Sequence, residues 1–461
     1  MAENMEIPNM QEQENFANNG IKIKATLSPD EHCDLPYIEM EDDDWAKLAE
    51  TMKEQAIDRA VISIGPVHPS THGVLRIVCE IEGETIKDCR VGTGYLHTGI
   101  EKNMEYRTWT QGVTYCTRMD YVAPLFQEVA YCMGVEKLLG IKVSTRVDAI
   151  RVLLMELNRI ASHLVAIGTG GNELGATTML TIGFRARENI LRILEHITGL
   201  RMNHAYIRPG GVATDIPEDT VEFIHNLLPK IRADIGKMQD LTMENPIFKL
   251  RQKDVGYISL PAAMALGLTG PCLRATGLPM DMRKLQPYCG YETYDFNIPV
   301  RDKSDSYNRT AVRFDECYES LRIIVQALER LENDHSPIMV EDKKIGWPSD
   351  LTVGKDGQGN NPKYVDEILG TSMESLIHHF KMISHGFDVP KGQVYTTIEH
   401  AKGVMGVHLV SDGGNKPYRA HFRDPSFSNL QSTSIMTEGS QIADFVVTLA
   451  SIDPVLGGVD R

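Results

Sequence analysis

The chain has 461 residues, enough for several structural units and at least one large buried core. Its composition is ordinary for a globular protein, with 42% hydrophobic and 24% charged residues. The 63 acidic residues outnumber the 47 basic ones, which gives a formal net charge of −16. A protein whose main partner is nucleic acid needs a basic face for the phosphates, so this balance argues against that function.

Neither a secretion signal nor a membrane span is predicted. The N-terminus lacks the basic segment and apolar run of a signal peptide, so the chain is expected to stay in the cytoplasm. The longest apolar stretch, near LPAAMALGLTG (Leu260 to Gly270), is much shorter than the ~18 residues of a spanning helix. If the protein works at a membrane, it does so from outside the lipid. The eight cysteines include no CxxC pair, so no cluster or zinc motif is predicted.

The N-terminal part is predicted to form an extended arm followed by a small sheet. Residues 1–57 are polar and mixed, with the acidic run EMEDDD, and are predicted to form an extended arm whose ordering depends on a partner. Residues 58–115 are predicted to contain a small antiparallel sheet. Apolar and other side chains alternate from Leu75 to Ile81, and Glu82-Gly83 supplies a turn.

A helical bundle is predicted over residues 116–388, with a loop insertion near 271–301. One helix is expected to begin behind Ser144-Thr145, with Asp148 completing a capping box. Apolar residues at helical spacing predict further long helices. These span about Ala176 to Thr198, Pro217 to Met243, Ser306 to Glu332 and Tyr364 to His385.

Residues 389–461 are predicted to form C-terminal β-hairpins and a terminal helix that packs into the core. The strand signals are QVYTTIEH, GVMGVHLVSD and YRAHFRD, and the helix lies near Gln441 to Ser451. The predicted fold class is therefore α+β and mainly helical, with a central helical bundle and small antiparallel sheets near the N- and C-terminal parts.

Two histidines, His68 and His72, stand four residues apart in GPVHPSTHGVLR, a spacing that suits a metal site on a helix. Pro69 disfavours helical geometry at His68, and Gly73 follows His72. The stretch is therefore predicted to be a loop between two strands, and a metallohydrolase site on these histidines loses its geometry. Such a loop either presents side chains to a site or ties the turn together through hydrogen bonds.

Two glycine-rich stretches resemble phosphate loops only weakly. GTGYLHTGIE, starting at Gly92, is not followed by a long helix with the Lys-Ser/Thr pair of a Walker motif. GTGGNELG, starting at Gly168, follows a helix, whereas a Rossmann turn follows a strand. The second stretch places Glu173 between two helices that are expected to be buried. A buried carboxylate needs a partner, which a histidine can supply.

Nine motifs in order make the chain similar to the D subunits of the proton-pumping NADH-quinone oxidoreductases, respiratory complex I. The resemblance runs from about Ile62 to Arg461. Its motifs are HPSTHGVLR, GYLHTGIEK with MEYRT, TRMDYVAP, YCMGVEKLLG, NRIASHLVAIGTGG, RPGG, VSDGGNKPYR, RDPSFSNL and SIDPVLGGVDR.

That family resembles the large subunit of nickel-iron hydrogenases, which holds its metal through a CxxC pair and a C-terminal DPCxxC pair. Here the corresponding positions are Asp120, Ala123, Val455 and Gly458. All four thiolates that such a soft metal site requires are absent, so hydrogen chemistry is excluded and no metal is predicted.

The resemblance implies a quinone pocket in the vacated metal site, shared with a partner subunit that carries the last 4Fe-4S cluster. By position, His72 and Tyr121 hydrogen-bond the quinone headgroup, and Glu173, where many relatives have Asp, interacts with the histidine. Arg107 and Arg118 are candidates for contact with the cluster or the partner. The chain itself binds no metal or flavin.

The implied activity is reduction of quinone to quinol, coupled to proton translocation by the rest of the complex, including its membrane arm. The implied location is peripheral, on the cytoplasmic side of the cell membrane. Reduction takes two electrons and two protons, so two proton-donating groups must reach the quinone oxygens, and histidine and tyrosine meet that need.

Two alternatives remain open from the sequence. The same subunit fits a quinone-reducing complex fed by ferredoxin or a deazaflavin, because the electron input lies on other subunits. A purely structural docking subunit is the other. The presence of His72, Tyr121 and Glu173 together argues against it, since a scaffold needs none of them.

Overall fold

The computed structural model describes residues 59–68, 73–340, 373, 377, 380, 381 and 384–461. The predicted arm (1–57), His72 and most of the helix predicted over Tyr364 to His385 lie outside these residues. The described elements are β1 (Arg59–Ile64), β2 (Arg76–Glu82), β3 (Thr85–Gly92), α3 (Ile100–Met104), α4 (Trp109–Cys116), α5 (Pro124–Leu139), α6 (Thr145–Glu173), α7 (Thr177–Thr198), β4 (Ile207–Arg208), β5 (Gly211–Val212), α8 (Thr220–Met243), α9 (Pro246–Gln252), α10 (Leu260–Ala265), α11 (Pro271–Arg274), α12 (Met282–Leu285), η2 (Tyr291–Thr293), α13 (Ser306–Asn333), β6 (Gly392–His400), β7 (Gly403–Ser411), β8 (Arg419–Arg423), α16 (Pro425–Leu430), α17 (Thr433–Thr437), α18 (Ile442–Ile452) and α19 (Leu456–Asp460).

The N-terminal sheet is antiparallel in the order β1-β2-β3, which confirms the predicted strands. Its register pairs Cys79 with Ile62 on one side and with Cys89 on the other. The buried side chains of β2 and β3 share a core with residues from the far end of the chain. That core includes Leu75, Ile77, Cys79, Ile81, Ile86, Cys89, Leu430, Phe445, Leu449, Leu456 and Val459.

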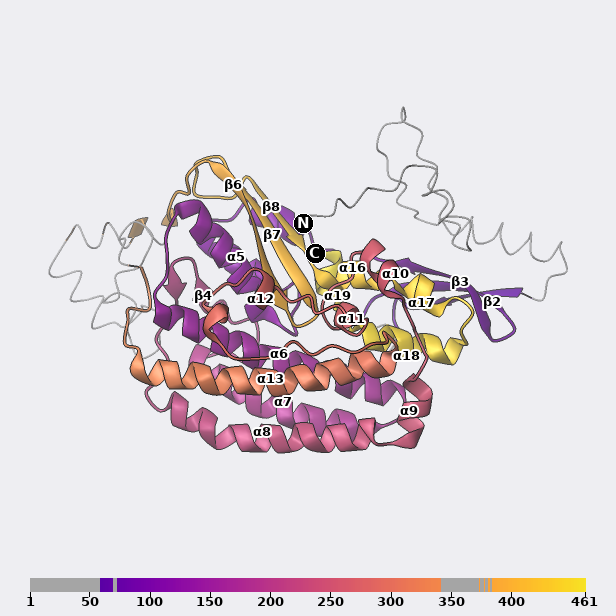
Figure 1. The fold of residues 1–461 in the computed structure, drawn as a ribbon. Helices are drawn as coiled ribbons and strands as arrows, with labels where there is room; N and C mark the ends of the chain where they lie inside the picture. Colours follow the sequence, from indigo (N-terminus) through magenta and orange to yellow (C-terminus); the bar gives the residue numbers. More distant parts are fainter. Residues whose placement is uncertain (1–58, 69–72, 341–372, 374–376, 378–379, 382–383) are drawn as a thin grey trace, which may run out of the picture. The chain divides into compact units, whose positions relative to one another are not determined.

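Long helices form the predicted bundle, and Figure 1 shows α6, α7, α8 and α13 running alongside one another. Helix α6 is buried on nearly all sides over its 29 residues, as expected for a central helix. Its cap differs from the prediction. The cap is Ser144, whose hydroxyl accepts a hydrogen bond from the Val147 N–H, so Asp148 lies one position too late for the predicted capping box. Among the described residues, no helix is both long and apolar enough to cross a membrane.

The C-terminal sheet has the order β6-β7-β8 and packs against α5. The turn between β6 and β7 is buried, which is unusual for a hairpin turn. A close backbone approach explains the glycine after this turn. Gly403 has φ of 144°, and a methyl group there would lie 2.3 Å from the Thr269 hydroxyl oxygen.

The segment predicted as a loop insertion contains only the short elements α11, α12 and η2, but it is anchored by buried charges. The guanidinium of Arg274 donates to Glu316 at 2.9 Å and to Glu399 at 2.6 Å. Arg283 donates to Asp281 and to Glu156 of α6. All of these side chains are buried, so the segment is tied to α6, α13 and β6 rather than lying on the surface.

Candidate functional site

Tyr121 lies in the bend that connects α4 to α5. The bend is organised by Asp120, which is 0% exposed. One oxygen of the Asp120 carboxylate accepts hydrogen bonds from the N–H groups of Val122 at 3.0 Å and Ala123 at 3.1 Å. Tyr121 itself is only partly buried. Burial and the Asp120 charge raise its pKa above the usual value, with Lys402 opposing, so the phenol keeps its proton and remains a hydrogen-bond donor.

The C-terminal helix α19 lies directly against this bend. A methyl group at Gly457 would lie 2.3 Å from the Met119 carbonyl oxygen and 3.2 Å from the ring of Tyr121. At Gly458 it would lie 2.4 Å from the Asp424 carboxylate. Both glycines are therefore needed because another part of the chain approaches their backbone too closely for a side chain.

The connection between β1 and β2 reaches the same helix. His68 forms an isolated β-bridge with Gly73, which brings the two ends of the predicted loop together. A methyl group at Gly73 would lie 3.1 Å from the side chain of Leu456 in α19. The stretch is thus a strand connection, as predicted, and its end at Gly73 lies beside the segment that packs on Tyr121. His72 lies outside the described residues.

A group of buried charges, here called the Lys402 cluster, lies behind the bend. Its members are Asp120, His400, Lys402, Asp424 and Asp453, and none is more than 5% exposed. The Lys402 ammonium lies 2.8 Å from Asp120 Oδ2 and 3.7 Å from Asp453 Oδ2. His400 Nε2 lies 3.4 Å from the same Asp120 oxygen.

The pKa values of this cluster follow from burial and from the single ammonium. Burial works against ionisation of Asp120, but Lys402 lowers its pKa below the usual value. Burial and the Asp120 charge raise the pKa of Asp424 to about 6, and burial raises the pKa of Asp453. Burial lowers the pKa of His400 to about 3, so His400 is neutral at pH 7. The ammonium of Lys402 is therefore the positive charge among three carboxylates.

Glu173 is the last residue of α6 and, as predicted, stands between two helices. It is partly exposed rather than buried, because α6 ends there and α7 begins four residues later. The expectation of a buried carboxylate at this position is therefore wrong. The predicted contact between Glu173 and His72 lies outside the described residues.

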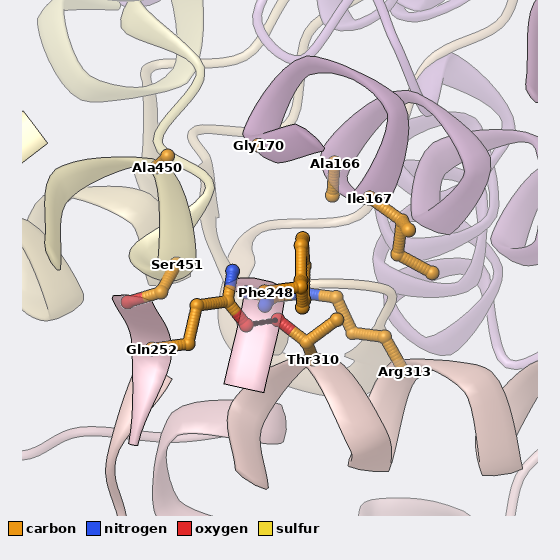
Figure 2. Close-up of a pocket in the computed structure, with 9 residues that line it drawn as sticks. All are labelled: Ala166, Ile167, Gly170, Phe248, Gln252, Thr310, Arg313, Ala450 and Ser451. Atoms are coloured by element: carbon orange, nitrogen blue, oxygen red, sulfur yellow. Dashed lines mark hydrogen bonds between the residues drawn. The ribbon is translucent and has the colours of Figure 1, made fainter. Parts of the chain in front are cut away.

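A small cavity lies just before the end of α6, between α6, α9, α13 and α18 (Figure 2). Its volume of about 10 Å³ is room for roughly a single water molecule. Figure 2 shows Gln252, Thr310 and Arg313 gathered around Phe248, and the Thr310 hydroxyl donates to Gln252 at 3.3 Å. A quinone headgroup does not fit this cavity.

A larger surface groove of about 390 Å³ lies between α5, the start of α6 and β6. Lys137, Lys142 and Asp148 contribute to its lining, and burial raises the pKa of Asp148 to about 6. Neither this groove nor the small cavity is lined by Tyr121 or Glu173.

The two predicted arginines lie on the surface at either end of α4. Arg107 donates to the Tyr115 hydroxyl at 3.0 Å, and Arg118 donates to the Thr114 carbonyl and the Thr117 hydroxyl at 2.7 Å. Both side chains are exposed, so their charges face outward from the α4 segment.

The glycine-rich stretch from Gly92 binds a carboxylate of the chain itself. Its amides at Gly94 and Leu96 donate to the two carboxylate oxygens of Asp460 at 2.8 and 2.6 Å. The donors that a phosphate loop would offer are thus used to attach the C-terminal helix, which explains why the stretch carries loop-like glycines without a Walker helix.

Sequence reasoning missed most of the Lys402 cluster. Asp424 and Asp453 each precede a proline in motifs of the family resemblance, and Lys402 follows a predicted strand. Those features indicate turns. They do not indicate that the three turns meet in the interior.

Comparison with known proteins assigns the family. The model of the family "Respiratory-chain NADH dehydrogenase, 49 Kd subunit" matches residues 173–461. The chain is 58% identical over 422 residues to the D subunit of the NADH-quinone oxidoreductase of a Nocardioides species, covering 91% of this chain and 95% of the relative. It is 59% identical over 420 residues to the D subunit numbered 2 of Streptomyces coelicolor, with coverage of 91% and 95%. The D subunit of Mycobacterium avium is 57% identical over 421 residues, again with coverage of 91% and 95%.

The fold defines the class of protein. It is a mainly helical protein that has no membrane-spanning helix among its described residues. The chain belongs to the 49 kDa subunit family of respiratory-chain NADH dehydrogenases, whose curated bacterial members are named as D subunits of NADH-quinone oxidoreductase. It is thus a subunit of an oxidoreductase complex, and the other subunits of that complex are its partners.

Proposed function

We propose that this subunit forms the quinone-reducing pocket of its complex together with the partner subunit that carries the terminal 4Fe-4S cluster. Electrons from that cluster reduce quinone to quinol, and the reaction is coupled to proton translocation through the membrane arm. In this proposal the subunit is peripheral, on the cytoplasmic side of the cell membrane, and His72 and Tyr121 hydrogen-bond the quinone headgroup.

The state and position of Tyr121 carry this proposal. Its side chain is half-buried, its pKa is raised, and it lies in a bend held by Asp120 and α19, so a protonated phenol is presented at a fixed place. The exposed Arg107 and Arg118 lie on the same part of the chain and suit an electrostatic contact with an iron-sulfur partner. A pocket shared with a partner is consistent with Tyr121 lining neither of the two cavities described above.

A relation to the hydrogenase large-subunit fold is part of the proposal. The four positions that correspond to metal ligands come from two segments, one with Asp120 and Ala123 and one with Val455 and Gly458. These segments are in contact, because the Gly457 backbone packs on the Met119 carbonyl. A buried salt bridge and carboxylates occupy the neighbourhood instead of thiolates.

The protons of the reaction come from the two headgroup ligands. Quinone that receives two electrons takes up two protons, and a neutral tyrosine and a histidine each supply one at the quinone oxygens. Once the histidine has lost its charge, Glu173 is no longer balanced by it. A contact ion pair is worth about 4 kcal/mol at an effective dielectric of ~20, which is enough to move a loop or a neighbouring pKa.

The headgroup assignment is tested in the purified complex with Tyr121→Phe and His72→Ala. Each is expected to lower NADH:quinone reductase activity by about 10²-fold or more, the usual loss of a positioned proton donor. Electron transfer from NADH to a water-soluble artificial acceptor should stay unchanged. Tyr418→Phe is the matched control, because Tyr418 lies just before β8 and is 68% exposed. Intact quinone activity in both variants would leave only a docking role.

The coupling role is tested with Glu173→Gln in the complex reconstituted into vesicles. Because the carboxylate is proposed to respond to the histidine charge, the number of protons moved per quinone reduced is expected to fall. A pH-sensitive dye measures the protons moved, and the oxidation of NADH measures the quinone reduced. The ratio of the two rates is compared with that of the wild type. Wild-type quinone reduction with a wild-type ratio would show that Glu173 does not couple the two processes.

A further inference from the structure

Lys402 occupies an unusual place for a lysine in a hairpin turn. It lies between β6 and β7, yet it is 2% exposed. Burying an ammonium is costly unless it is paired, and lysine is among the residues least often fully buried. The question is therefore what the molecule gains from inserting this turn into the core.

The ammonium of Lys402 joins three elements that are distant in sequence. It lies 2.8 Å from Asp120 in the α4–α5 bend, donates to the Ser162 hydroxyl in α6 at 3.0 Å, and lies 3.7 Å from Asp453 after α18. Replacing Lys402 by an uncharged residue removes all three of these contacts at once.

The bend held in this way is the bend that presents Tyr121. The Asp120 carboxylate contacts Lys402 through one oxygen, and through the other it accepts the Val122 and Ala123 N–H groups. The same carboxylate thus fixes the backbone on the C-terminal side of Tyr121. The helix α19 begins three residues after Asp453 and packs against the Tyr121 ring.

The charge of Lys402 also matters to the site. The other charged or titratable groups that act on the cluster are Asp120, Asp424, Asp453, His400, Arg159, Arg313 and His163. Oδ2 of Asp424 and Oδ2 of Asp453 accept no hydrogen bond from any described residue. Lys402 is therefore the cation in direct contact with Asp120 and Asp453, and its charge also acts on Asp424.

From these contacts we infer that Lys402 is a positioning residue for quinone reduction: its buried ammonium clamps the Tyr121 bend to the C-terminal segment and keeps Asp120 ionised beside Tyr121. This inference rests on the proposed function. Lys402 itself does not touch the quinone, and it acts through Asp120 and the packing of α19.

The test uses the purified complex with Lys402→Met, Lys402→Arg and the pair Asp120→Asn with Lys402→Met. The matched control is Lys391→Met, an exposed lysine just before β6. Steady-state kinetics with quinone give KM and kcat separately over a range of pH. Transfer to a water-soluble artificial acceptor reports whether the complex is assembled and reduced normally.

Lys402→Met is expected to raise the KM for quinone on the order of 10- to 100-fold, because a small misplacement of a headgroup ligand is enough for such a loss. It is also expected to move the acid limb of the kcat/KM profile to higher pH, since Asp120 without its cation binds a proton more readily. A merely structural lysine would not move that limb. The control is expected to match the wild type.

The other variants separate clamp from charge. The paired variant is expected to keep the raised KM with a smaller pH shift, because the titrating Asp120 is gone. Lys402→Arg keeps the charge and is expected to restore the wild-type pH profile. If the Lys402→Met complex does not assemble, the paired variant tests whether Lys402 holds the bend to the C-terminal segment. Lys402→Arg then tests whether the charge of Lys402 sets the pH profile.

A wild-type KM and pH profile in Lys402→Met, or a normal KM in the paired variant, overturns the inference. The outcome is read beside Tyr121→Phe. If Tyr121→Phe impairs quinone reduction and the Lys402 variants do not, only this inference fails. If Tyr121→Phe has no effect, the proposed function itself fails.

Discussion

Asp424 combines two structural roles in a single carboxylate. One oxygen caps α16 by accepting the Ser426 N–H at 2.7 Å. The other points into the Lys402 cluster, where burial and Asp120 raise the pKa of Asp424 to about 6 from 3.8. The folded protein therefore holds a proton on this group more tightly than the unfolded chain does. Ionising Asp424 costs stability, and the chain keeps the residue because the cap and the cluster both use it.

A pH dependence follows from that raised pKa. The contribution of Asp424 to the free energy of unfolding falls as pH rises from about 3.8 to about 6, and the loss is constant above that range. About two pKa units at about 1.4 kcal/mol each give a cost of roughly 3 kcal/mol. Asp424→Asn keeps the cap but not the titration. The thermal inactivation midpoint of the Asp424→Asn complex, relative to that of the wild type at the same pH, is expected to rise as pH rises towards 6. If the two midpoints differ by the same amount at every pH, the titration of Asp424 does not affect stability.

The helices and strands divide into those that local sequence specifies and those that distant contacts specify. Apolar spacing placed α7 and α13 within a residue of their observed bounds, because a 3.6-residue period is a local property. The cap of α6 was shifted by a residue because serine and threonine stand side by side there. The burial of Lys402 was not predictable. A hairpin turn is expected at the surface, and only the fold reveals the three elements that surround this one.

For the candidate site, the sequence predicts only the residues that lie in motifs of the family resemblance. The resemblance names His72, Tyr121 and Glu173 as site residues, and these roles stay predictions. The exposure of Glu173 depends on where α6 ends. The contact between α19 and the Tyr121 bend left a local trace in the pair Gly457-Gly458. In the sequence, two adjacent glycines indicate only a flexible turn. The structure shows that a methyl group at Gly457 would lie 2.3 Å from the Met119 carbonyl oxygen.

Gly457→Ala tests the packing of α19. The added methyl group meets backbone oxygens of Arg118 and Met119, which cannot rotate away, so α19 must shift from the Tyr121 bend. Overpacking of this kind costs about 1–3 kcal/mol. We expect a lower thermal inactivation midpoint and reduced quinone reductase activity per assembled complex.

Gly170→Ala in α6 is the control for that substitution. A methyl group there comes no closer than 3.9 Å to the Ala450 side chain, so it should be neutral or slightly stabilising. Equal effects from the two substitutions would mean that the approach of α19 to the bend is not what makes Gly457 necessary.

The two ends of the described chain are joined in several ways. The N-terminal sheet shares its core with α18 and α19, and Asp460 binds the amides of Gly94 and Leu96. Chain ends normally fray unless they are tied down. Here residues 453–459 are all buried, so the C-terminal segment is part of the core.

Asp460→Ala tests this connection. It removes the acceptor for two backbone N–H groups, and a charge-assisted hydrogen bond contributes about 1.5–3 kcal/mol. The thermal inactivation midpoint of the assembled complex is expected to fall. Asp460→Asn keeps one acceptor and should fall less. If alanine is as stable as the wild type, the Asp460 contacts do not hold the C-terminal segment.

This arrangement constrains the order of events during synthesis. Strands β2 and β3 are made more than 350 residues before the side chains that their apolar face packs against, which are Phe445, Leu449 and Leu456. While the chain is growing, that face has no partner and is open to misassociation with other chains. Native packing of the apolar face of β2 and β3 must therefore wait until these C-terminal residues have been added.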